Sequence, residues 1–343
     1  MSALLEARSL TVSYRVGSAS LARLCGRPVP EVQAIESIDL SIERGSVVGI
    51  VGESGCGKST LAKALVGLVP LAEGTVSLDG VPLSRRRTRE QTRRVQMVFQ
   101  DPSASLNPSM TIGQTLCELL RVHRMVPPSE VQARAEDLMA LVELPASLLQ
   151  AYPRRLSGGQ RQRVGIARAL ALEPEVLVGD ESVAALDVSV QAAILNLLQK
   201  LRAELGLTIL FISHDLAVVR HLCDRVVVMY LGTVVEDRST EDLFCDPRHP
   251  YTAALLSAAP RLGIEKSPRG SALRGEPASL HAVPSGCRFH PRCPVARSEC
   301  ATRVPMLAGP KTDQLAACHY AWDPGAALAD GPGQSRIADE WRD

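Results

Sequence analysis

The chain has 343 residues and a formal net charge of +1, with 45% hydrophobic and 22% charged residues. This composition is that of an ordinary globular protein, and the length allows two or three domains with a sizeable core. The near-neutral charge gives no electrostatic basis for nucleic-acid binding. The N-terminus lacks the features of a signal peptide, and no uncharged apolar run reaches the roughly 18 residues of a membrane span. We expect a protein that is soluble or peripheral to a membrane.

Residues 1–51 predict short alternating strands separated by a loop at 15–31. Leu10, Val12 and Tyr14 fall on one face of the first strand. Tyr14, at the end of that strand, is either a core aromatic or a residue that stacks on a purine ring.

A glycine-rich stretch follows the apolar run 47–51, which predicts a buried strand, and precedes a helix-forming segment at 61–66. This order of strand, glycine turn, Lys-Ser and helix is the context expected of a phosphate-binding loop. Its glycines let backbone N–H groups point into one concavity, Lys58 can reach the outer phosphates, and the Ser59 hydroxyl can hold Mg²⁺. The alternative is a chance glycine turn. We expect a nucleoside triphosphate to bind to Gly52, Glu53, Ser54, Gly55, Cys56, Gly57, Lys58, Ser59 and Thr60.

Three further apolar runs, each predicted to be a buried strand, end in polar residues. Gln100 follows the first, Asp180 and Glu181 follow the second, and His214 follows the third. Ligands bind beyond the carboxyl ends of the strands in open α/β sheets. Asp180 is therefore expected to hold Mg²⁺ and Glu181 to activate water. His214 is a candidate contact to the γ-phosphate, although a lone histidine is more often structural.

Two segments between these strands have their own character. The six arginines between 85 and 94 are interpreted as a solvated helix face rather than a nucleic-acid contact, since no aromatic residues are interleaved with them. Residues 101–160 carry two apolar stripes at helical spacing between prolines, which predicts an inserted helical subdomain. A helix is expected from Arg161 to Leu172.

Nine cysteines are present, and four of them cluster near the C-terminus in the pattern C-x5-C-x6-C-x17-C. The odd count argues against a disulfide framework. The five scattered cysteines are interpreted as small buried hydrophobic residues. The clustered thiols suit either an iron–sulfur cluster or zinc, and the absence of a C-x2-4-C knuckle favours iron–sulfur. The expected ligands are Cys287, Cys293, Cys300 and Cys318.

Across residues 1–245 the chain resembles the nucleotide-binding subunit of an ATP-binding-cassette (ABC) transporter. The resemblance rests on the phosphate loop, the strand ending in Asp180 and Glu181, and the segment Leu156–Gln160, which reads LSGGQ. It implies a P-loop (RecA-like) α/β fold with a helical subdomain at about 101–160. Tyr14 would stack on the base, and Gln100 would contact Mg²⁺. Asp187 matches the family's D-loop aspartate.

The resemblance also implies a mechanism. Two subunits would dimerise head to tail, so that each ATP lies between one phosphate loop and the signature motif of the other subunit. Glu181 would polarise the attacking water, and His214 and Lys58 would stabilise charge on the γ-phosphate. Ser182 and Ala184 replace the family's usual proline and serine, and because neither change removes a charged catalytic group, we expect the chain to hydrolyse ATP. The signature residues are Ser157, Gly158, Gly159 and Gln160.

The segments 248–256 and 286–294 resemble the C-terminal extension of the oligopeptide/dipeptide importer branch, where four cysteines hold a [4Fe–4S] cluster. We therefore expect a small metal-stapled extension at 246–322, which includes a linker at 260–285 and precedes a disordered tail at 323–343. Zinc remains the alternative metal.

The sequence thus predicts the ATPase subunit of a di/oligopeptide importer, peripheral on the cytoplasmic face of the cell membrane. Its expected partners are a second, homologous ATPase subunit, two permease subunits and an extracytoplasmic binding protein. An importer of nickel–chelate complexes or glutathione is the alternative within transport. A non-transport ABC ATPase is the alternative outside it, although such proteins usually carry two cassettes or long coiled coils.

Overall fold

A computed structural model of the chain describes residues 3–15, 31–101, 105–181, 187–258 and 279–322. The expectations for the loop at 16–30, for Ser182 and Ala184, for linker residues 260–278 and for the tail at 323–343 lie outside these residues.

The largest sheet has the strand order β11-β12-β10-β9-β3-β8-β7-β6. Five consecutive strands of this sheet are parallel, from β9 through β3, β8 and β7 to the edge strand β6. The remaining strands β10, β12 and β11 are antiparallel to their neighbours. The strand bounds are β3 Val47–Val51, β6 Val95–Val98, β7 Val176–Asp180, β8 Thr208–Ile212, β9 Arg225–Tyr230, β10 Thr233–Ser239, β11 Ala308–Lys311 and β12 Gln314–Ala316. The predicted buried strands are present: β3 ends at Val51 as predicted, and β6, β7 and β8 end within two residues of Gln100, Glu181 and His214.

A second, antiparallel sheet has the order β2-β1-β4-β5. The expectation of short strands near the N-terminus is wrong, because β1 (Ala3–Arg15) and β2 (Glu31–Glu43) each have 13 residues. Irregular pairing interrupts both, and Ser9 and Ser37 adopt positive φ there. Strands β4 (Glu73–Leu78) and β5 (Val81–Pro82) form a hairpin through Asp79 and Gly80, both at positive φ, as an Asp-Gly turn requires.

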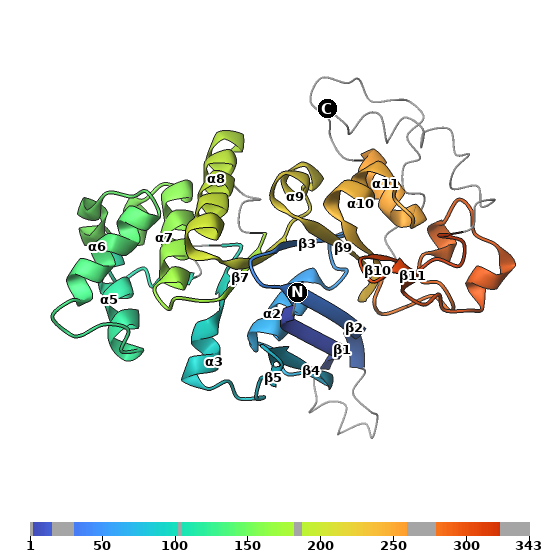
Figure 1. Cartoon of the computed structure of the whole chain (residues 1–343), viewed down its shortest axis with the longest axis horizontal. Helices are drawn as coiled ribbons and strands as arrows, with labels where there is room; N and C mark the ends of the chain where they lie inside the picture. The colour runs from blue at the N-terminus through green and yellow to red at the C-terminus, as the bar shows by residue number, and fades with distance from the viewer. Residues whose placement is uncertain (1–2, 16–30, 102–104, 182–186, 259–278, 323–343) are drawn as a thin grey trace, which may run out of the picture.

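Helices cover both faces of the large sheet (Figure 1). The α-helices are α2 Lys58–Val66, α3 Arg89–Arg94, α5 Ile112–Val122, α6 Val131–Leu141, α7 Gly158–Leu170, α8 Val188–Leu205, α9 Leu216–Leu222, α10 Thr240–Cys245 and α11 Pro250–Ala258. The short 3-10 helices are η1 Ala146–Gln150, η2 Pro153–Arg155, η3 His290–Arg292 and η4 Ser298–Ala301. Helix α7 begins three residues before the predicted start, so the signature glycines form its first turn.

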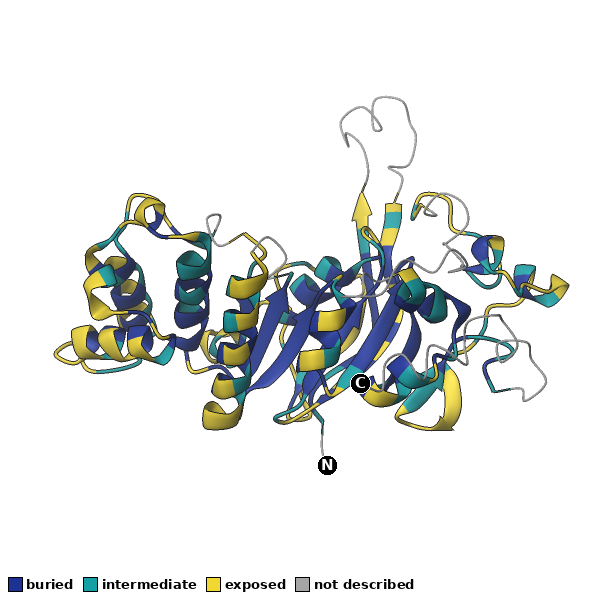
Figure 2. Cartoon of the chain, turned by 90° about the horizontal axis from the view of Figure 1, so that it is seen from above, coloured by how far each residue is buried: buried dark blue, intermediate teal, exposed yellow. Residues whose placement is uncertain are grey.

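The central strands are buried on both faces, as Figure 2 shows. Alternate side chains of each strand enter different apolar clusters, because successive residues of a strand point to opposite faces. Val48 and Ile50 of β3 pack with α2 and the antiparallel sheet. Val47 and Val51 pack on the opposite side, with the cluster that includes residues of α5 to α9. The strand ends at the phosphate loop are therefore fixed from both sides.

The C-terminal extension is built into this architecture. Strand β12 pairs with β10, through Glu236↔Ala316 and Arg238↔Gln314, so the extension widens the large sheet. Tyr251, Leu256 and Phe289 belong to the same apolar cluster as β9. The extension therefore shares the core of the ATPase domain instead of forming a separate one.

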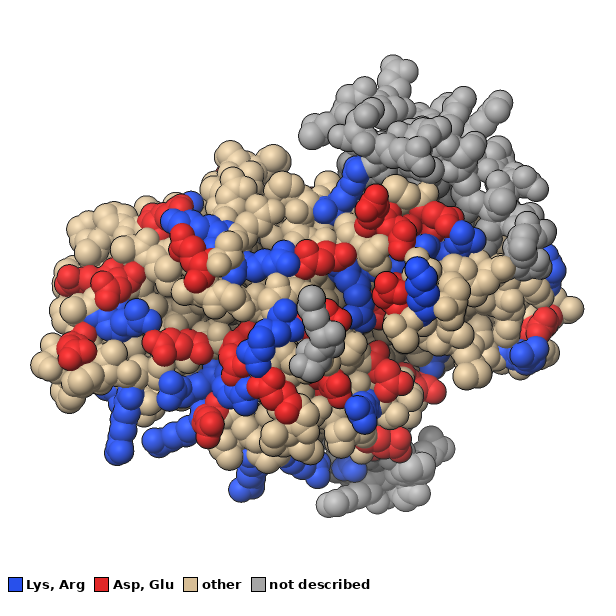
Figure 3. All heavy atoms as spheres, viewed as in Figure 1, with Lys and Arg blue, Asp and Glu red and all other residues tan. Residues whose placement is uncertain are grey.

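The arginine-rich segment is only partly a solvated face. Arg85, Arg86 and Arg89 are exposed as predicted. Arg94 instead pairs with Asp79 and Glu175, and Arg87 donates to the Leu65 carbonyl. On the face shown in Figure 3, acidic and basic side chains are interspersed.

Candidate nucleotide site and cysteine pocket

The phosphate loop joins β3 to α2 with the backbone that its glycines allow. Gly52, Gly55 and Gly57 have φ of 152°, 81° and 107°. A Cβ on Gly52 would lie 2.3 Å from the Met229 carbonyl oxygen, and one on Gly57 would lie 2.6 Å from that of Ala34. No other residue type fits these two positions. The loop therefore presents its N–H groups at a helix N-terminus, which is an anion-binding arrangement.

Lys58 is folded back over this loop and is 5% exposed. Its Nζ donates to the carbonyl oxygens of Gly52 at 2.8 Å and Glu53 at 3.0 Å. Cys56 is buried beside it, with Sγ 4.0 Å from Nζ. The ammonium group is thus held over the concavity where phosphates would bind.

Ser59 and Asp180 meet at the end of β7. The Ser59 hydroxyl donates to Oδ1 of Asp180 at 2.9 Å. Burial raises the pKa of Asp180, with a smaller contribution from the neighbouring Glu181. Adjacent oxygen ligands of an octahedral Mg²⁺ lie about 2.9 Å apart, given Mg–O distances of 2.0–2.1 Å. The pair therefore fits two neighbouring ligand positions of that ion.

Glu181 contacts the polar residues that follow β6 and β8. Its Oε2 accepts a hydrogen bond from Nε2 of Gln100 at 2.8 Å, and its Oε1 lies 3.7 Å from Nδ1 of His214. Its backbone has φ of 43° and donates to the Ile212 carbonyl oxygen at 3.0 Å. The structure thus places Gln100, Asp180, Glu181 and His214 with the phosphate loop at one edge of the sheet. Tyr14, 40% exposed, is the last but one residue of β1.

The signature residues lie elsewhere, at the start of α7. Ser157 is exposed and caps the helix, its Oγ accepting from the Gln160 N–H while the Gln160 side chain accepts from the Ser157 N–H. A Cβ on Gly159 would lie 2.4 Å from Cγ1 of Val190, so the glycine allows α7 and α8 to approach closely. No described contact joins residues 157–160 to the phosphate loop of the same chain.

Two residues that the sequence analysis gave no role contact the phosphate loop from the extension. Arg292 forms a two-pronged ion pair with Glu53, and the Tyr251 phenol oxygen accepts the Glu53 N–H at 2.7 Å. The sequence contains one signal for Arg292: Glu53 is an acidic residue in an anion-binding loop, where a positively charged side chain is needed to offset its charge.

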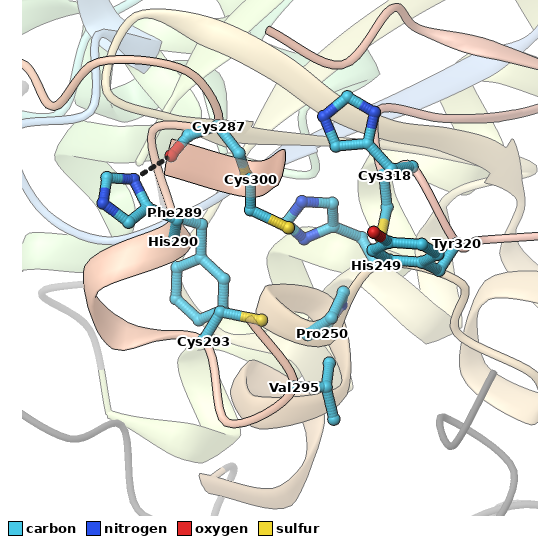
Figure 4. Close-up of a pocket in the computed structure, with 11 residues that line it drawn as sticks. His249, Pro250, Cys287, Phe289, His290, Cys293, Val295, Cys300, Cys318 and Tyr320 are labelled. Atoms are coloured by element: carbon cyan, nitrogen blue, oxygen red, sulfur yellow. Dashed lines mark hydrogen bonds between the residues drawn. The ribbon is translucent and has the colours of Figure 1, made fainter. Parts of the chain in front are cut away.

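The four clustered cysteines line one pocket together with His249, Phe289, His290, His319 and Tyr320 (Figure 4). Burial raises the pKa of Cys287 and Cys318, and raises that of Cys293 to about 12, with smaller contributions from the neighbouring thiols. Of the described residues, no three His, Cys, Asp or Glu side chains are placed to hold a metal ion. The described cysteines are all free thiols, and Cys56, Cys117 and Cys223 are buried.

His249 adds a polar group to this pocket. It is fully buried, and burial lowers its pKa to about 3, so the ring is neutral. Its Nδ1 accepts the Tyr251 N–H at 3.1 Å, which leaves the ring proton on Nε2. The pocket thus combines four sulfur atoms with a ring that has one N–H donor.

Comparison with known proteins identifies two families along the chain. The ABC transporter family matches residues 35–184, and the oligopeptide/dipeptide transporter C-terminal region matches residues 235–300. The oligopeptide transport ATP-binding protein OppF of Salmonella typhimurium is 47% identical over 289 residues, covering 82% of this chain and 86% of that protein. OppF of Escherichia coli is 45% identical over 312 residues, covering 89% and 93%.

Solved structures agree with this fold. The structure of cbiO1 from Clostridium perfringens, part of the ABC transporter complex cbiONQ, aligns with a TM-score of 0.61 at 29% identity and covers 72% of this chain and 92% of its own. The ATP-binding cassette MJ0796, dimeric in a post-hydrolysis state with ADP and Pi, aligns with a TM-score of 0.60 at 28% identity, covering 69% and 98%. The chain belongs to the ABC transporter ATPase family and carries that family's oligopeptide/dipeptide transporter C-terminal region.

Proposed function

We propose that this chain is the ATP-binding and ATP-hydrolysing subunit of an importer of di- or oligopeptides, and that hydrolysis drives the conformational change of its permease. One observation carries the proposal: the extension that matches the oligopeptide/dipeptide transporter region packs on the phosphate loop. The OppF relatives, named for oligopeptide transport, span most of the chain and support the same substrate class. Importers of nickel–chelate complexes or glutathione remain the alternative.

ATP would bind with its phosphates in the loop concavity and its base beside Tyr14. The N–H groups at the start of α2 would donate to the phosphate oxygens, and the Lys58 ammonium group, positioned by the loop carbonyls, would bind the outer phosphates. Ser59 and Asp180, with the Gln100 amide oxygen, would hold Mg²⁺, which supplies charge neutralisation at the β- and γ-phosphates when bound.

Hydrolysis would proceed by attack of water on the γ-phosphorus, which breaks its bond to the β–γ bridging oxygen and releases ADP. Glu181 would accept the proton of that water, and the Gln100 and His214 contacts would fix the orientation of its carboxylate. Lys58 and His214 would stabilise the negative charge that develops on the γ-phosphate.

A second ATPase subunit is needed in this mechanism. Among the signature residues Ser157 is exposed and 158–160 are half-buried, and we propose that they serve ATP bound to a partner, since no described contact joins them to the phosphate loop of their own chain. The dimeric MJ0796 cassette supports a paired arrangement. We propose that the partner is a homologous ATPase, and that the pair docks on two permease subunits served by an extracytoplasmic binding protein.

The chain would then lie on the cytoplasmic face of the membrane through its permease contacts. Among the described residues, no helix is both long and apolar enough to cross a bilayer. We propose an ATPase domain at 1–245, with a helical subdomain at about 101–160 built from α5 and α6, and an extension at 246–322. The mutual packing of Ile112, Leu116 and Leu138 supports the helical unit.

We propose that the cysteine pocket holds a [4Fe–4S] cluster, with zinc as the alternative. The donor set supports this proposal, because four sulfur atoms and the His249 ring line one largely apolar pocket. The side chains would have to rearrange around the metal, since among the described residues no three of them are placed to hold an ion. A bound metal would favour the thiolate forms of cysteines whose pKa burial raises. The absorption spectrum and metal content of protein purified without oxygen test this assignment. A visible band with about four irons per chain supports it, whereas one zinc and no colour overturns it.

The transport proposal is tested by uptake into vesicles that contain the complete transporter. Labelled dipeptides and pentapeptides, a nickel–chelate complex and glutathione are compared with and without ATP. ATP-dependent uptake of peptides, lost in a Glu181→Gln variant, is the expected result. Uptake of only the nickel complex or glutathione would overturn the substrate class. ATPase activity that does not copurify with membranes or permeases would point to a non-transport ATPase.

A further inference from the structure

Glu53, the second residue of the phosphate loop, is held from outside the loop by the C-terminal extension. The Arg292 guanidinium donates from Nη1 to Oε2 at 2.7 Å and from Nη2 to Oε1 at 2.8 Å. The Tyr251 phenol oxygen accepts the Glu53 N–H at 2.7 Å. These contacts join residues 239 and 198 positions apart, so they exist only when the extension is docked.

Arg292 and Tyr251 are held firmly in place. The Arg292 side chain is 6% exposed, and Tyr251 is fully buried. The ring of Tyr230 packs against that of Tyr251 at 4.7 Å and that of Phe289 at 5.4 Å between centroids. A planar guanidinium in a two-pronged pair fixes direction as well as distance. The carboxylate of Glu53 raises the pKa of Arg292, so the guanidinium stays charged.

Glu53 transmits this restraint to the catalytic lysine. Its side chain is fixed by Arg292 and its N–H by Tyr251, while its carbonyl oxygen accepts a hydrogen bond from Lys58 Nζ at 3.0 Å. A shift of Glu53 would therefore move a carbonyl group that holds the ammonium group over the phosphate site. Through Glu53, the extension is thus linked to the lysine at the phosphate site.

The same contact reaches the cysteine pocket. Arg292 ends the 3-10 helix η3 and directly precedes Cys293, which lines the pocket. Phe289 also lines the pocket, and its carbonyl oxygen accepts the Arg292 N–H at 3.0 Å. Because Cys293 is the next residue along the chain, a change in its position would shift the backbone of Arg292.

We propose that Arg292 is a positioning residue for ATP binding, which acts through Glu53 to hold the phosphate loop, and that this ion pair couples the cysteine pocket to the nucleotide site of the same chain. Because such coupling is reciprocal, a change in the arrangement of the cysteines alters ATP affinity, and bound ATP alters the arrangement of the cysteines.

Substitution of Arg292 tests the first half of this proposal. Arg292→Met removes both hydrogen bonds to Glu53 and keeps an unbranched apolar stem, while Arg292→Lys keeps the charge but not the paired geometry. Direct titration of the full chain with a fluorescent ATP analogue is expected to show affinity weakened about tenfold for Arg292→Met and about threefold for Arg292→Lys. In the complete transporter KM should rise by similar factors, while kcat stays within about twofold.

The matched control is Arg303→Met, in an exposed ion pair with Glu299 of the same extension. Its nucleotide affinity should equal that of the wild type. Unchanged affinity in a folded Arg292→Met chain, or equal weakening by Arg303→Met, overturns the proposal.

Glu53→Gln separates positioning from simple electrostatics, and it is informative even if Arg292→Met does not fold. Removing the carboxylate leaves an extra positive charge near the phosphate site, so a purely electrostatic role predicts tighter ATP binding. A positioning role predicts weaker ATP binding. The variant that carries both Glu53→Gln and Arg292→Met should bind ATP as tightly as the single variant with the lower affinity, because the two residues act through one contact. Tighter binding, or fully additive losses, contradicts positioning.

Alkylation of Cys293 tests the coupling to the pocket. In full-length protein from which bound metal has first been removed with a chelator, the rate of its reaction with iodoacetamide is followed by mass spectrometry of its peptide, with and without ATP and Mg²⁺. In the wild type and Arg303→Met, nucleotide should change the rate by about threefold or more, and in Arg292→Met the dependence should disappear. A rate that nucleotide leaves unchanged in the wild type overturns the coupling.

Discussion

Glu181 occupies a left-handed backbone conformation, with φ of 43°, that turns its carboxylate toward Gln100 and His214. We predict that Glu181→Gln lowers ATP hydrolysis by at least about 100-fold, because the amide keeps the shape of the side chain but cannot accept a proton. ATP affinity should stay within about threefold of the wild type, since Glu181 is no phosphate ligand. Phosphate release and nucleotide titration measure the two effects.

Glu204→Gln is the matched control, since this exposed glutamate lies on α8. It should hydrolyse ATP at the wild-type rate. A Glu181→Gln protein that keeps more than about a tenth of the wild-type rate would exclude Glu181 as the base.

Glu236 is a fully buried carboxylate whose two oxygens accept the N–H groups of Arg248 and His249 at 2.8 and 2.9 Å. Burial nevertheless raises its pKa above the ordinary 4.5. The folded state therefore holds its proton more tightly than the unfolded state, and the stability that this proton gives is lost as pH rises from about 4.5 through the folded pKa.

Substitution of this residue should reveal that loss. We predict that Glu236→Gln costs about 1–3 kcal/mol at low pH, because an amide offers one acceptor where two are used. The difference in Tm between wild type and variant should be largest near pH 4.5 and shrink toward pH 8. Calorimetry across this range is the measurement. A difference that grows with pH would mean that the two N–H donors outweigh burial.

At the scale of elements, two helices of the region around 101–160 begin with the same capping box. Ser157 and Gln160 cap α7, and Thr111 and Gln114 cap α5. We predict that Ser157→Ala and Thr111→Ala each cost about 1 kcal/mol of stability, because each leaves one helix N–H without its acceptor. Only Ser157→Ala should also lower ATP hydrolysis, by about tenfold, if this hydroxyl serves ATP on the partner subunit.

Thermal unfolding and phosphate release in the complete transporter measure both effects. Equal activity of the two variants would remove Ser157 from the proposed composite site and leave it only the role of a helix cap.

The elements differ in how far the sequence could predict them. The strands ending at Val51, Asp180 and Ile212 were predictable, because buried parallel strands are continuous apolar runs. Polar residues directly after such runs must share one sheet edge, so the placement of Gln100 and Glu181 followed. Strands β11 and β12 were missed: their sequences, AGPK and QLA, have almost no apolar alternation. Only pairing with β10 makes them strands.

Long-range contacts explain the remaining omissions. The Arg292–Glu53 pair joins residues 239 positions apart, and no local pattern encodes the docking that brings them together. The four cysteines were recognisable by spacing, yet spacing did not reveal that Phe289, between them, completes an aromatic cluster with Tyr230 and Tyr251.

At the scale of the whole molecule, the extension and the ATPase domain share one core. Phe289 is 1% exposed, and its ring packs 5.4 Å from those of Tyr230 and Tyr251. We predict that Phe289→Ala lowers the main unfolding transition of the entire chain by at least about 5 °C, because the cavity removes about 3–5 kcal/mol from a core common to both parts. Val304→Ala, at a position in the extension that is 72% exposed, should leave the transition unchanged.

Calorimetry with hydrogen exchange at α2 and β3 distinguishes a shared core from an independent extension. If the core is shared, Phe289→Ala increases exchange at these elements, although they lie outside the extension. An independent extension would instead unfold in its own early transition, and the ATPase transition would keep its wild-type Tm. Tyr251 and Arg292 contact the phosphate loop from this same cluster. A shared core therefore also predicts that ATP raises the Tm of the whole chain and slows hydrogen exchange in β12.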